Sequence, residues 1–168
     1  MQQKTKLTYR PLNLHHHRDL IIQYRVDAFI CSFGNADKFW KKDPQAEQYI
    51  EWLHSKLAID PNSMAHVLLD DVIIGQIELG HFKNDPKIGY VYLFYLVPEM
   101  RGKNLASQLD QYAMHYFHNE GYKSAMLSVS PSNTRVIKFY ERMGWHKSDI
   151  QHDDRELIFM EKIPDINV

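Results

Sequence analysis

The sequence predicts a mixed α/β (α+β) fold in which helices flank a central, mostly antiparallel mixed sheet of about six to seven strands. Three runs in the middle of the chain, 64–69, 72–82 and 88–97, are rich in apolar, β-branched and aromatic residues, and polar turn residues separate them. Two helical patterns precede these runs, and two more alternate with strand patterns after them. The short turns between the middle runs indicate hairpins, which argue against a parallel nucleotide-binding sheet.

The segment before the middle runs predicts one strand and two helices. Residues 7–14 form the strand, and a helical pattern begins at His15 and is ended by Gly34. A polar connector, 35–43, leads to a second amphipathic helix that ends at Asp60. The two helices fit either a wall for a bound substrate or a simple cover of the sheet.

The middle and last parts of the chain complete the sheet. The run 88–97 alternates apolar and aromatic residues onto both faces, so we expect it to be central and covered twice. After it we expect a helix over 101–119 with Gly121 as its C-terminal cap, and a helix over 134–143 with Asn133 or Ser132 as its N-terminal cap. The remaining strands are expected at 125–129, 145–147 and 156–163.

Length and charge limit the classes of function. The 168 residues suit a single domain over 1–168, and 44% hydrophobic with 24% charged residues is an ordinary globular composition. The 20 basic and 21 acidic residues give a net charge of −1, which provides no support for a nucleic-acid partner.

The chain carries one cysteine, Cys31, so no disulfide can form within it. Because Cys31 follows the apolar run 28–30, we expect its thiol to be buried. Residues 1–9 contain no apolar core of signal-peptide length, and no apolar run approaches the roughly 20 residues of a membrane span. We therefore expect a cytoplasmic protein with no membrane partner.

Three consecutive histidines, His15, His16 and His17, are the obvious candidates for a metal site. Adjacent positions on a helix point in different directions, so these side chains are not expected to converge on one ion. We expect a solvated helix start here, and no metal.

The junction at 101–106 predicts a phosphate-binding loop. An apolar strand runs into it and an amphipathic helix follows, and the junction combines Arg101, Gly102, Lys103 and the small Ala106. The N-terminus of a helix presents unpaired N–H groups and the positive end of the helix dipole. A glycine and two cations at this place are typical of phosphate recognition.

Two blocks of residues carry a pattern that goes beyond the loop. The first is Arg101-Gly102-Lys103-Asn104-Leu105-Ala106, and the second runs from Asn133 through Tyr140 to Gly144-Trp145. In this order, with a helix and a strand between them, they resemble the GNAT superfamily of N-acetyltransferases, whose patterns are Gln/Arg-x-x-Gly-x-Gly/Ala and Asn…Tyr-x-x-x-Gly-aromatic. The order of elements is similar to this family over nearly the whole chain. One departure is Asn104, which stands where the family prefers glycine.

The resemblance implies an acetyl-CoA-dependent N-acetyltransferase. Backbone N–H groups of the loop would hold the pyrophosphate of coenzyme A, the end of the preceding strand would pair with the pantetheine arm, and a strand N–H there would stabilise the oxyanion. Asn133 would hydrogen-bond the arm, or act only as a helix cap. The residues assigned to the cosubstrate are Leu96, Val97, Arg101, Gly102, Lys103, Asn104, Leu105, Ala106 and Asn133.

Proton transfer needs an acid and a base. Tyr140 stands where the family places the acid that protonates the leaving thiolate, although a core aromatic at this helical spacing is the alternative. Family members often carry a basic carboxylate on the strand before the loop, where this chain has Tyr90 and Tyr92. Glu78 on the preceding strand is therefore the candidate base. A water-mediated route, His81 and His146 remain alternatives to it.

The acceptor is expected to be a primary amine of a small molecule or peptide that attacks the thioester directly in a ternary complex. A non-catalytic CoA-binding or sensory module with the same fold is the alternative function, favoured by Asn104 and by the missing strand carboxylate. A homodimer is common in the family and stays open beside a monomer.

Overall fold

The computed structural model of the protein describes residues 4–166, and every predicted strand and helix is present in it. The helices are α1 (Arg18–Phe33), α2 (Asp37–Lys42), α3 (Glu47–Ile59), α4 (Ala106–Asn119) and α5 (Thr134–Arg142), with short 3₁₀ turns at Pro61–Ser63 and Pro98–Met100. The strands are β1 (Thr8–Pro11), β2 (Met64–Leu69), β3 (Val72–Phe82), β4 (Asp85–Leu96), β5 (Ser124–Val129), β6 (His146–Lys147) and β7 (Ile158–Lys162).

The strands of residues 4–166 form one sheet of seven in the order β1-β2-β3-β4-β5-β7-β6. The pair β4–β5 is parallel, whereas β1–β2, β2–β3, β5–β7 and β6–β7 are antiparallel. The predicted mixed, mostly antiparallel sheet is therefore confirmed. The hairpin between β2 and β3 turns at Asp70 and Asp71, which both have positive φ, as a tight two-residue turn requires.

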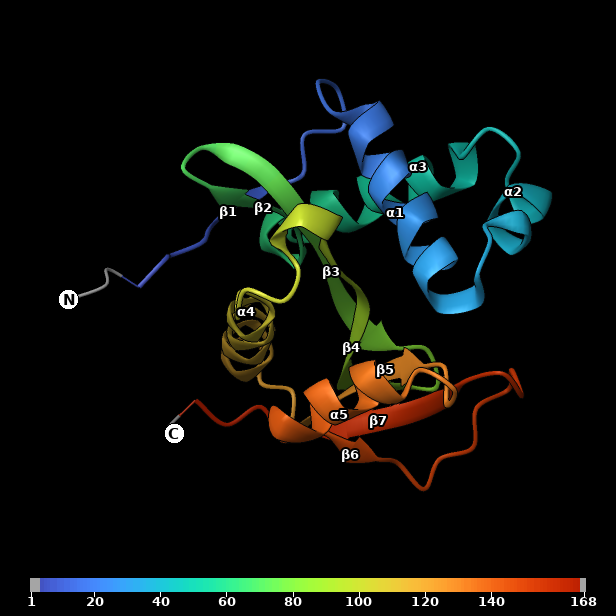
Figure 1. Cartoon of the computed structure of the whole chain (residues 1–168), viewed down its shortest axis with the longest axis vertical. Helices are drawn as coiled ribbons and strands as arrows, with labels where there is room; N and C mark the ends of the chain where they lie inside the picture. Colours follow the sequence, from blue (N-terminus) through green and yellow to red (C-terminus); the bar gives the residue numbers. More distant parts are fainter. Residues whose placement is uncertain (1–3, 167–168) are drawn as a thin grey trace. The chain divides into compact units, whose positions relative to one another are not determined.

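The contacts of the chain divide it into two compact units. The first unit is the chain up to Glu78 together with Leu93–Leu109, and the second is Leu79–Tyr92 together with the chain from Asp110 onward. In the first unit, α1, α2 and α3 lie close to one another (Figure 1). The expectation of a single domain over 1–168 stays a prediction.

Aromatic packing in the first unit explains why α2 was missed as a helix. The segment 35–43 was predicted to be a connector, but Asp37–Lys42 is helical and buries Phe39. The ring centroid of Phe39 lies 5.5 Å from that of Phe29 on α1 and 6.0 Å from that of Tyr49 on α3. A six-residue helix shows no apolar period of its own, so tertiary packing decides its structure.

Strand β4 is central, as predicted, but its two faces are not equally covered. Val91, Leu93 and Tyr95 are buried, whereas Tyr90 and Tyr92 on the other face are only partly buried. The face of Tyr90 and Tyr92 is therefore covered, but less completely than the other, and the hydroxyl groups of the two tyrosines make hydrogen bonds there.

The parallel pairing of β4 with β5 covers only part of β4. It runs from Ile88↔Ser124 to Val91↔Leu127, whereas β4 continues to Leu96. Within the described residues, β4 therefore continues past Val91, the last residue recorded as paired with β5.

The second unit is held by a buried charge cluster around α4. The indole Nε1 of Trp145, which is 2% exposed, donates to Asp110 Oδ1 at 2.7 Å. Lys162 Nζ donates to Asp110 Oδ2 at 2.8 Å and also to the carbonyl of Met143 at the end of α5.

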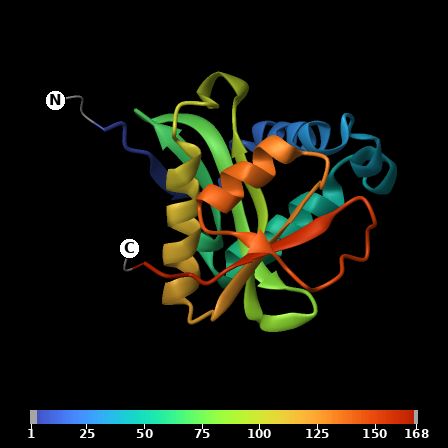
Figure 2. The same ribbon diagram turned by 60° about the horizontal axis from the view of Figure 1, so that its bottom comes forward.

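Figure 2 shows α4 as one continuous helix, and the long loop between β6 and β7.

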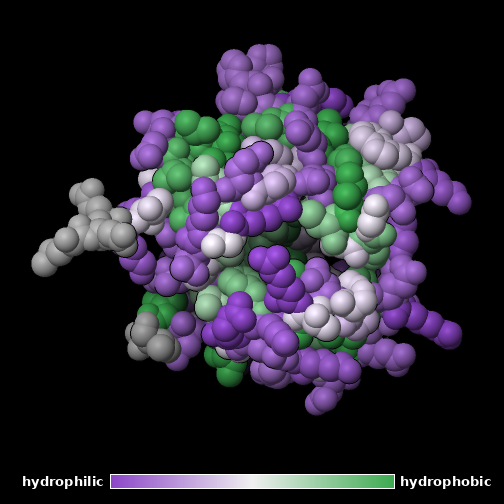
Figure 3. All heavy atoms as spheres, viewed as in Figure 1, coloured by the Kyte–Doolittle hydropathy of each residue, from purple (hydrophilic) through white to green (hydrophobic). Residues whose placement is uncertain are grey.

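The exposure of Cys31 differs from the prediction. Cys31 is exposed, so its predicted burial is wrong; its neighbour Ile30 is 43% exposed, because α1 buries its face at Ile21 and Tyr24 instead. Polar side chains dominate the face drawn in Figure 3, with hydrophobic residues between them. None of the helices formed by residues 4–166 is long and apolar enough to cross a membrane.

Acid should destabilise the fold through His66 on β2. Its Nε2 accepts the N–H of Asn13 at 3.0 Å, and burial, with His17 nearby, lowers the pKa of His66 to about 4. Between this value and about 6.5 the unfolded state binds more protons, so stability falls as pH falls through that window, by on the order of 3 kcal/mol at most.

Urea unfolding at several pH values would measure this loss. We expect His66→Gln to flatten the dependence between pH 6.5 and 4. His54→Gln, an exposed histidine on α3, is the matched control and should keep the wild-type dependence. An unchanged slope in His66→Gln would contradict the assignment.

Candidate active site

The turn between β4 and α4, in the first unit, contains the residues for which a phosphate loop is predicted. Helix α4 begins at Ala106 and not at Arg101 as predicted, because Gly102 and Asn104 have φ values of 73° and 61°. Asparagine tolerates this left-handed conformation better than most residues, which explains how Asn104 replaces the family's glycine. Leu105 is buried and anchors the turn.

The backbone of this turn has the donors that a phosphate needs. Within residues 4–166, the structure records no protein acceptor for the N–H groups of 102–106. A Cβ at Gly102 would meet no atom within 4 Å, so the turn is open on that side. Left-handed residues at the alternate positions 102 and 104, followed by a helix N-terminus, can direct amides toward an anion, and Lys103 is exposed beside them.

Arg101 is engaged differently from the other loop residues. Its Nε donates to the carbonyl of Leu96 at 2.8 Å, and its Nη2 lies 3.1 Å from Asp27 Oδ2 on α1. Val97 is also engaged, because its N–H donates to the carbonyl of Ile74 on β3 at 2.8 Å. Consecutive residues of an extended chain present their N–H groups to opposite edges, so the N–H of Leu96 faces away from β3.

Glu78 lies at the centre of a buried polar cluster in the first unit. Its Oε2 accepts from the hydroxyl of Tyr49 at 2.5 Å and from Gln76 Nε2 at 2.8 Å, and its Oε1 lies 3.7 Å from Arg25 Nη2. Burial and the charge of Glu78 raise the pKa of Tyr49, which therefore stays a donor. Within the described chain, Glu78 Oε1 accepts no hydrogen bond.

Tyr140 and Asn133 belong to the second unit. The ring of Tyr140 packs edge-to-face on Trp145 with centroids 6.0 Å apart, and burial with the nearby charge of Asp110 raises the pKa of its hydroxyl. No hydrogen bond of this hydroxyl is recorded to any residue between 4 and 166. Asn133 caps α5 by accepting the N–H of Val136 at 3.3 Å, which confirms its predicted capping role.

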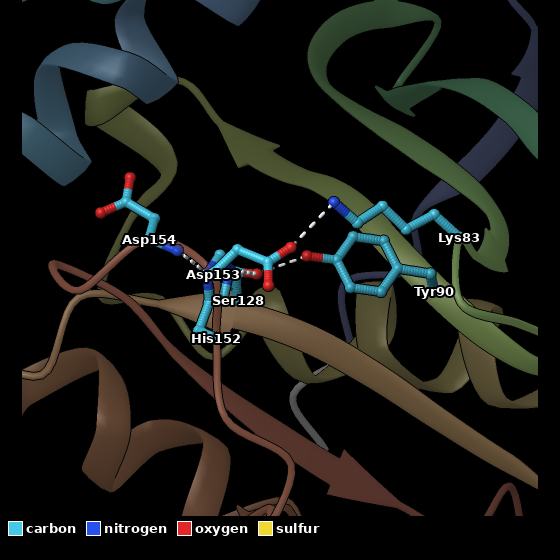
Figure 4. Close-up of polar contacts among 6 residues, drawn as sticks. All are labelled: Lys83, Tyr90, Ser128, His152, Asp153 and Asp154. Carbon is cyan, nitrogen blue, oxygen red and sulfur yellow. Dashed lines mark hydrogen bonds and ion pairs between the residues drawn. The ribbon is translucent and has the colours of Figure 1, made fainter.

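A second polar cluster, not anticipated from the sequence, joins three elements of the second unit (Figure 4). The hydroxyls of Tyr90 on β4 and Ser128 on β5 share a hydrogen bond, and Ser128 Oγ lies 2.9 Å from His152 Nε2. Asp154 N–H donates to His152 Nδ1 at 2.9 Å. An exposed ion pair, Lys83–Asp153 at 3.1 Å, lies beside the cluster.

The direction of these bonds excludes a Ser–His nucleophile. Because Nδ1 of His152 accepts a backbone N–H, a neutral ring carries its proton on Nε2 and donates it to Ser128. Burial lowers the pKa of His152, which favours this neutral form. A general base for serine would need the opposite tautomer, so the cluster orients hydroxyl groups and does not activate one.

The other histidines proposed as a base or a metal ligand lie at the surface or pack against another histidine ring. His81 and His146 are exposed, and His146 Nε2 lies 3.1 Å from Glu161 Oε1. His17 packs on His66 instead of converging with His15 and His16. Over the described residues, no group of three or more His, Cys, Asp or Glu side chains could hold a metal ion.

The family is established by comparison with known proteins. A model of the acetyltransferase (GNAT) family matches residues 23–145, which is most of the chain. The protein therefore belongs to this family of acetyltransferases.

Individual relatives match shorter parts. Mycothiol acetyltransferase of Streptomyces griseus is 33% identical over 70 residues, which are 40% of this chain and 23% of that protein. N-alpha-acetyltransferase 30 of Schizosaccharomyces pombe is 32% identical over 57 residues, 34% of this chain and 38% of that protein. The match thus spans less than half the length of either relative.

Solved structures share the fold over nearly the whole chain. The structure of yncA from Salmonella typhimurium with its cofactor acetyl-CoA has a TM-score of 0.71 at 15% identity, and the match covers 98% of this chain and 97% of that one. The PaiA N-acetyltransferase of Thermoplasma acidophilum in complex with coenzyme A has a TM-score of 0.62 at 22% identity, covering 94% and 99%.

Substitution of Asn104 tests the loop conformation. Asn104→Gly keeps the positive φ without cost, whereas Asn104→Ala places a residue that disfavours it, at about 1 kcal/mol. We expect Asn104→Ala to lower the free energy of unfolding by about this amount relative to Asn104→Gly in urea titrations. Equal stability of the two variants would contradict the left-handed geometry.

Proposed function

We propose that this protein transfers an acetyl group from acetyl-CoA to a primary amine of a small molecule or peptide, by direct attack of the amine in a ternary complex. The observation that carries the proposal is the turn at 102–106, which presents backbone N–H groups ahead of α4 in a chain of the GNAT family. A reducing, cytoplasmic setting suits its single exposed cysteine.

The cosubstrate would be held by backbone groups. Acetyl-CoA supplies the acetyl group as a thioester. The N–H groups of 102–106, with Lys103 beside them, would bind the pyrophosphate, and the carbonyl of Leu96 at the edge of β4 would accept a hydrogen bond from an amide of the pantetheine arm. Asn133 keeps amide donors available besides its capping oxygen, so it can also bind the arm.

Stabilisation of the developing oxyanion is assigned to Leu96. The N–H of Val97, the other candidate, already donates to Ile74. As the amine nitrogen bonds to the carbonyl carbon, negative charge grows on the carbonyl oxygen, and a fixed N–H is worth most at that point.

Tyr140 is proposed to protonate the departing sulfur when the carbon–sulfur bond breaks, and its phenolate then takes up the second proton that the nitrogen loses as the amide forms. Its raised pKa keeps the phenol protonated throughout the neutral range, so a donor is always present. The hydroxyl has no recorded internal partner within 4–166, in contrast to those of Tyr49 and Tyr95.

Glu78 is the proposed acceptor of the proton that the ammonium loses, through a bridging water. Its Oε2 accepts from Tyr49 and Gln76, whereas Oε1, which lies 3.7 Å from Arg25 Nη2, accepts no recorded hydrogen bond within 4–166 and is assigned this role. The fully buried position of Glu78 favours transfer through water over direct contact.

The role of Tyr140 can be measured by thiol release over a panel of amines. We expect Tyr140→Phe to lower kcat about 100-fold or more, with little change in the KM for acetyl-CoA, because the lost proton acts only as the sulfur leaves. Tyr116→Phe, the same change on α4, is the matched control and should turn over normally. An undiminished kcat would overturn the acid role, and wild-type binding of CoA without turnover of any amine would favour the non-catalytic module.

A further inference from the structure

Asp27 on α1 contacts both ends of the segment that joins β4 to the phosphate loop. Its Oδ2 accepts a hydrogen bond from the hydroxyl of Tyr95, the penultimate residue of β4, and another from Arg101 Nη2 at 3.1 Å. All three residues belong to the first unit. One carboxylate oxygen on a helix therefore joins the strand end and the start of the loop.

The guanidinium of Arg101 is held on more than one side. Its Nε donates to the carbonyl of Leu96 at 2.8 Å, its Nη2 is paired with Asp27, and its central carbon lies 5.3 Å from the ring centroid of Tyr95. A planar guanidinium offers its donors in a fixed fork, so these contacts also fix where the group points. The guanidinium that the loop pattern assigns to the cosubstrate thus makes its recorded contacts with residues of the first unit.

We propose that Asp27 is a positioning residue for the acyl-carrier site, and that it acts through Tyr95 and Arg101 on the two peptide groups that flank Leu96, the one with its N–H and the one with its carbonyl. The proposal rests on the function proposed above, because it assigns the carbonyl of Leu96 to the pantetheine arm and the N–H of Leu96 to the thioester oxygen. Arg101 then serves as a brace that fixes the carbonyl of Leu96, while the pyrophosphate is left to the backbone N–H groups of 102–106 and to Lys103.

The chemistry of the contacts supports a positioning role over a simple surface ion pair. The side chains of Asp27 and Arg101 are 31% and 40% exposed, and such a pair in isolation contributes little to stability. Here the same oxygen also accepts a hydrogen bond from the hydroxyl of Tyr95. Burial and the hydrogen bond to the charged Asp27 raise the pKa of Tyr95, so the hydroxyl stays a donor at neutral pH. Both donors are held against one acceptor, which fixes geometry more than it adds energy.

The direction in which the affinity for CoA changes when Asp27 loses its charge separates this proposal from a purely electrostatic role. CoA is an anion, so Asp27→Asn would strengthen its binding if the carboxylate acted only by long-range repulsion or by restraining Arg101 from the phosphates. If Asp27 positions the loop, Asp27→Asn weakens binding, because the amide keeps an acceptor for Tyr95 but loses the charged partner of Arg101.

The test is calorimetric titration of CoA into the full chain. We expect Asp27→Asn to bind CoA about tenfold more weakly than wild type, with an unchanged thermal midpoint of unfolding. Asp19→Asn, which removes an exposed carboxylate from the same helix, is the matched control and should bind CoA as wild type or slightly more tightly. Equal or tighter binding by Asp27→Asn overturns the proposal.

A second measurement separates a brace from a phosphate ligand. Turnover of acetyl-pantetheine, a thioester without phosphates, should fall about tenfold in Arg101→Gln, because the peptide of Leu96 is no longer fixed. Lys103→Gln is the reference for a phosphate contact, with a loss confined to acetyl-CoA. If Arg101→Gln shows the Lys103→Gln profile, the brace is wrong. Wild-type protein that neither binds CoA nor turns over either thioester would instead refute the proposed function itself.

Discussion

The candidate site in the first unit depends on the backbone conformation of the turn between β4 and α4. Two residues with positive φ, Gly102 and Asn104, delay the start of the helix until Ala106. A helix that began at Arg101 would bond the amides of Leu105 and Ala106 to its own carbonyls, so fewer N–H groups would be available to an anion. The buried Leu105 and the braced Arg101 secure the two ends of this turn. Backbone conformation, and not a set of charged side chains, therefore defines the candidate anion site.

Much of the fold could be predicted because its elements follow local rules. The apolar period predicts β2, β3 and β4, and the hairpin at Asp70–Asp71, the cap at Asn133 and the stop at Gly121 each follow from one residue's preference. Helix α2 could not be predicted in this way, because Phe39 is buried by partners on α1 and α3 that are distant in sequence. The exposure of Cys31 depends likewise on which face of α1 the rest of the unit covers.

The polar clusters mark the limit of sequence reasoning about the site. Gln76 and Glu78 are two residues apart on a strand, so alternation places them on one face, and two polar residues amid apolar ones signal a buried cluster. Nothing local indicates that Tyr49 from α3 completes it, or that Ser128 and His152 meet Tyr90. The missing carboxylate at Tyr90 could be recognised from the sequence, but the hydrogen bonds made in its place required the structure.

The exposed thiol of Cys31 has a practical consequence. It is the chain's single cysteine, and it lies one helical turn beyond Asp27 on α1. A maleimide fluorophore would therefore attach at one defined place, and no other cysteine would need to be replaced. Changes in its emission on addition of nucleotide thioesters would follow events near α1 in real time, and rapid mixing would resolve their order.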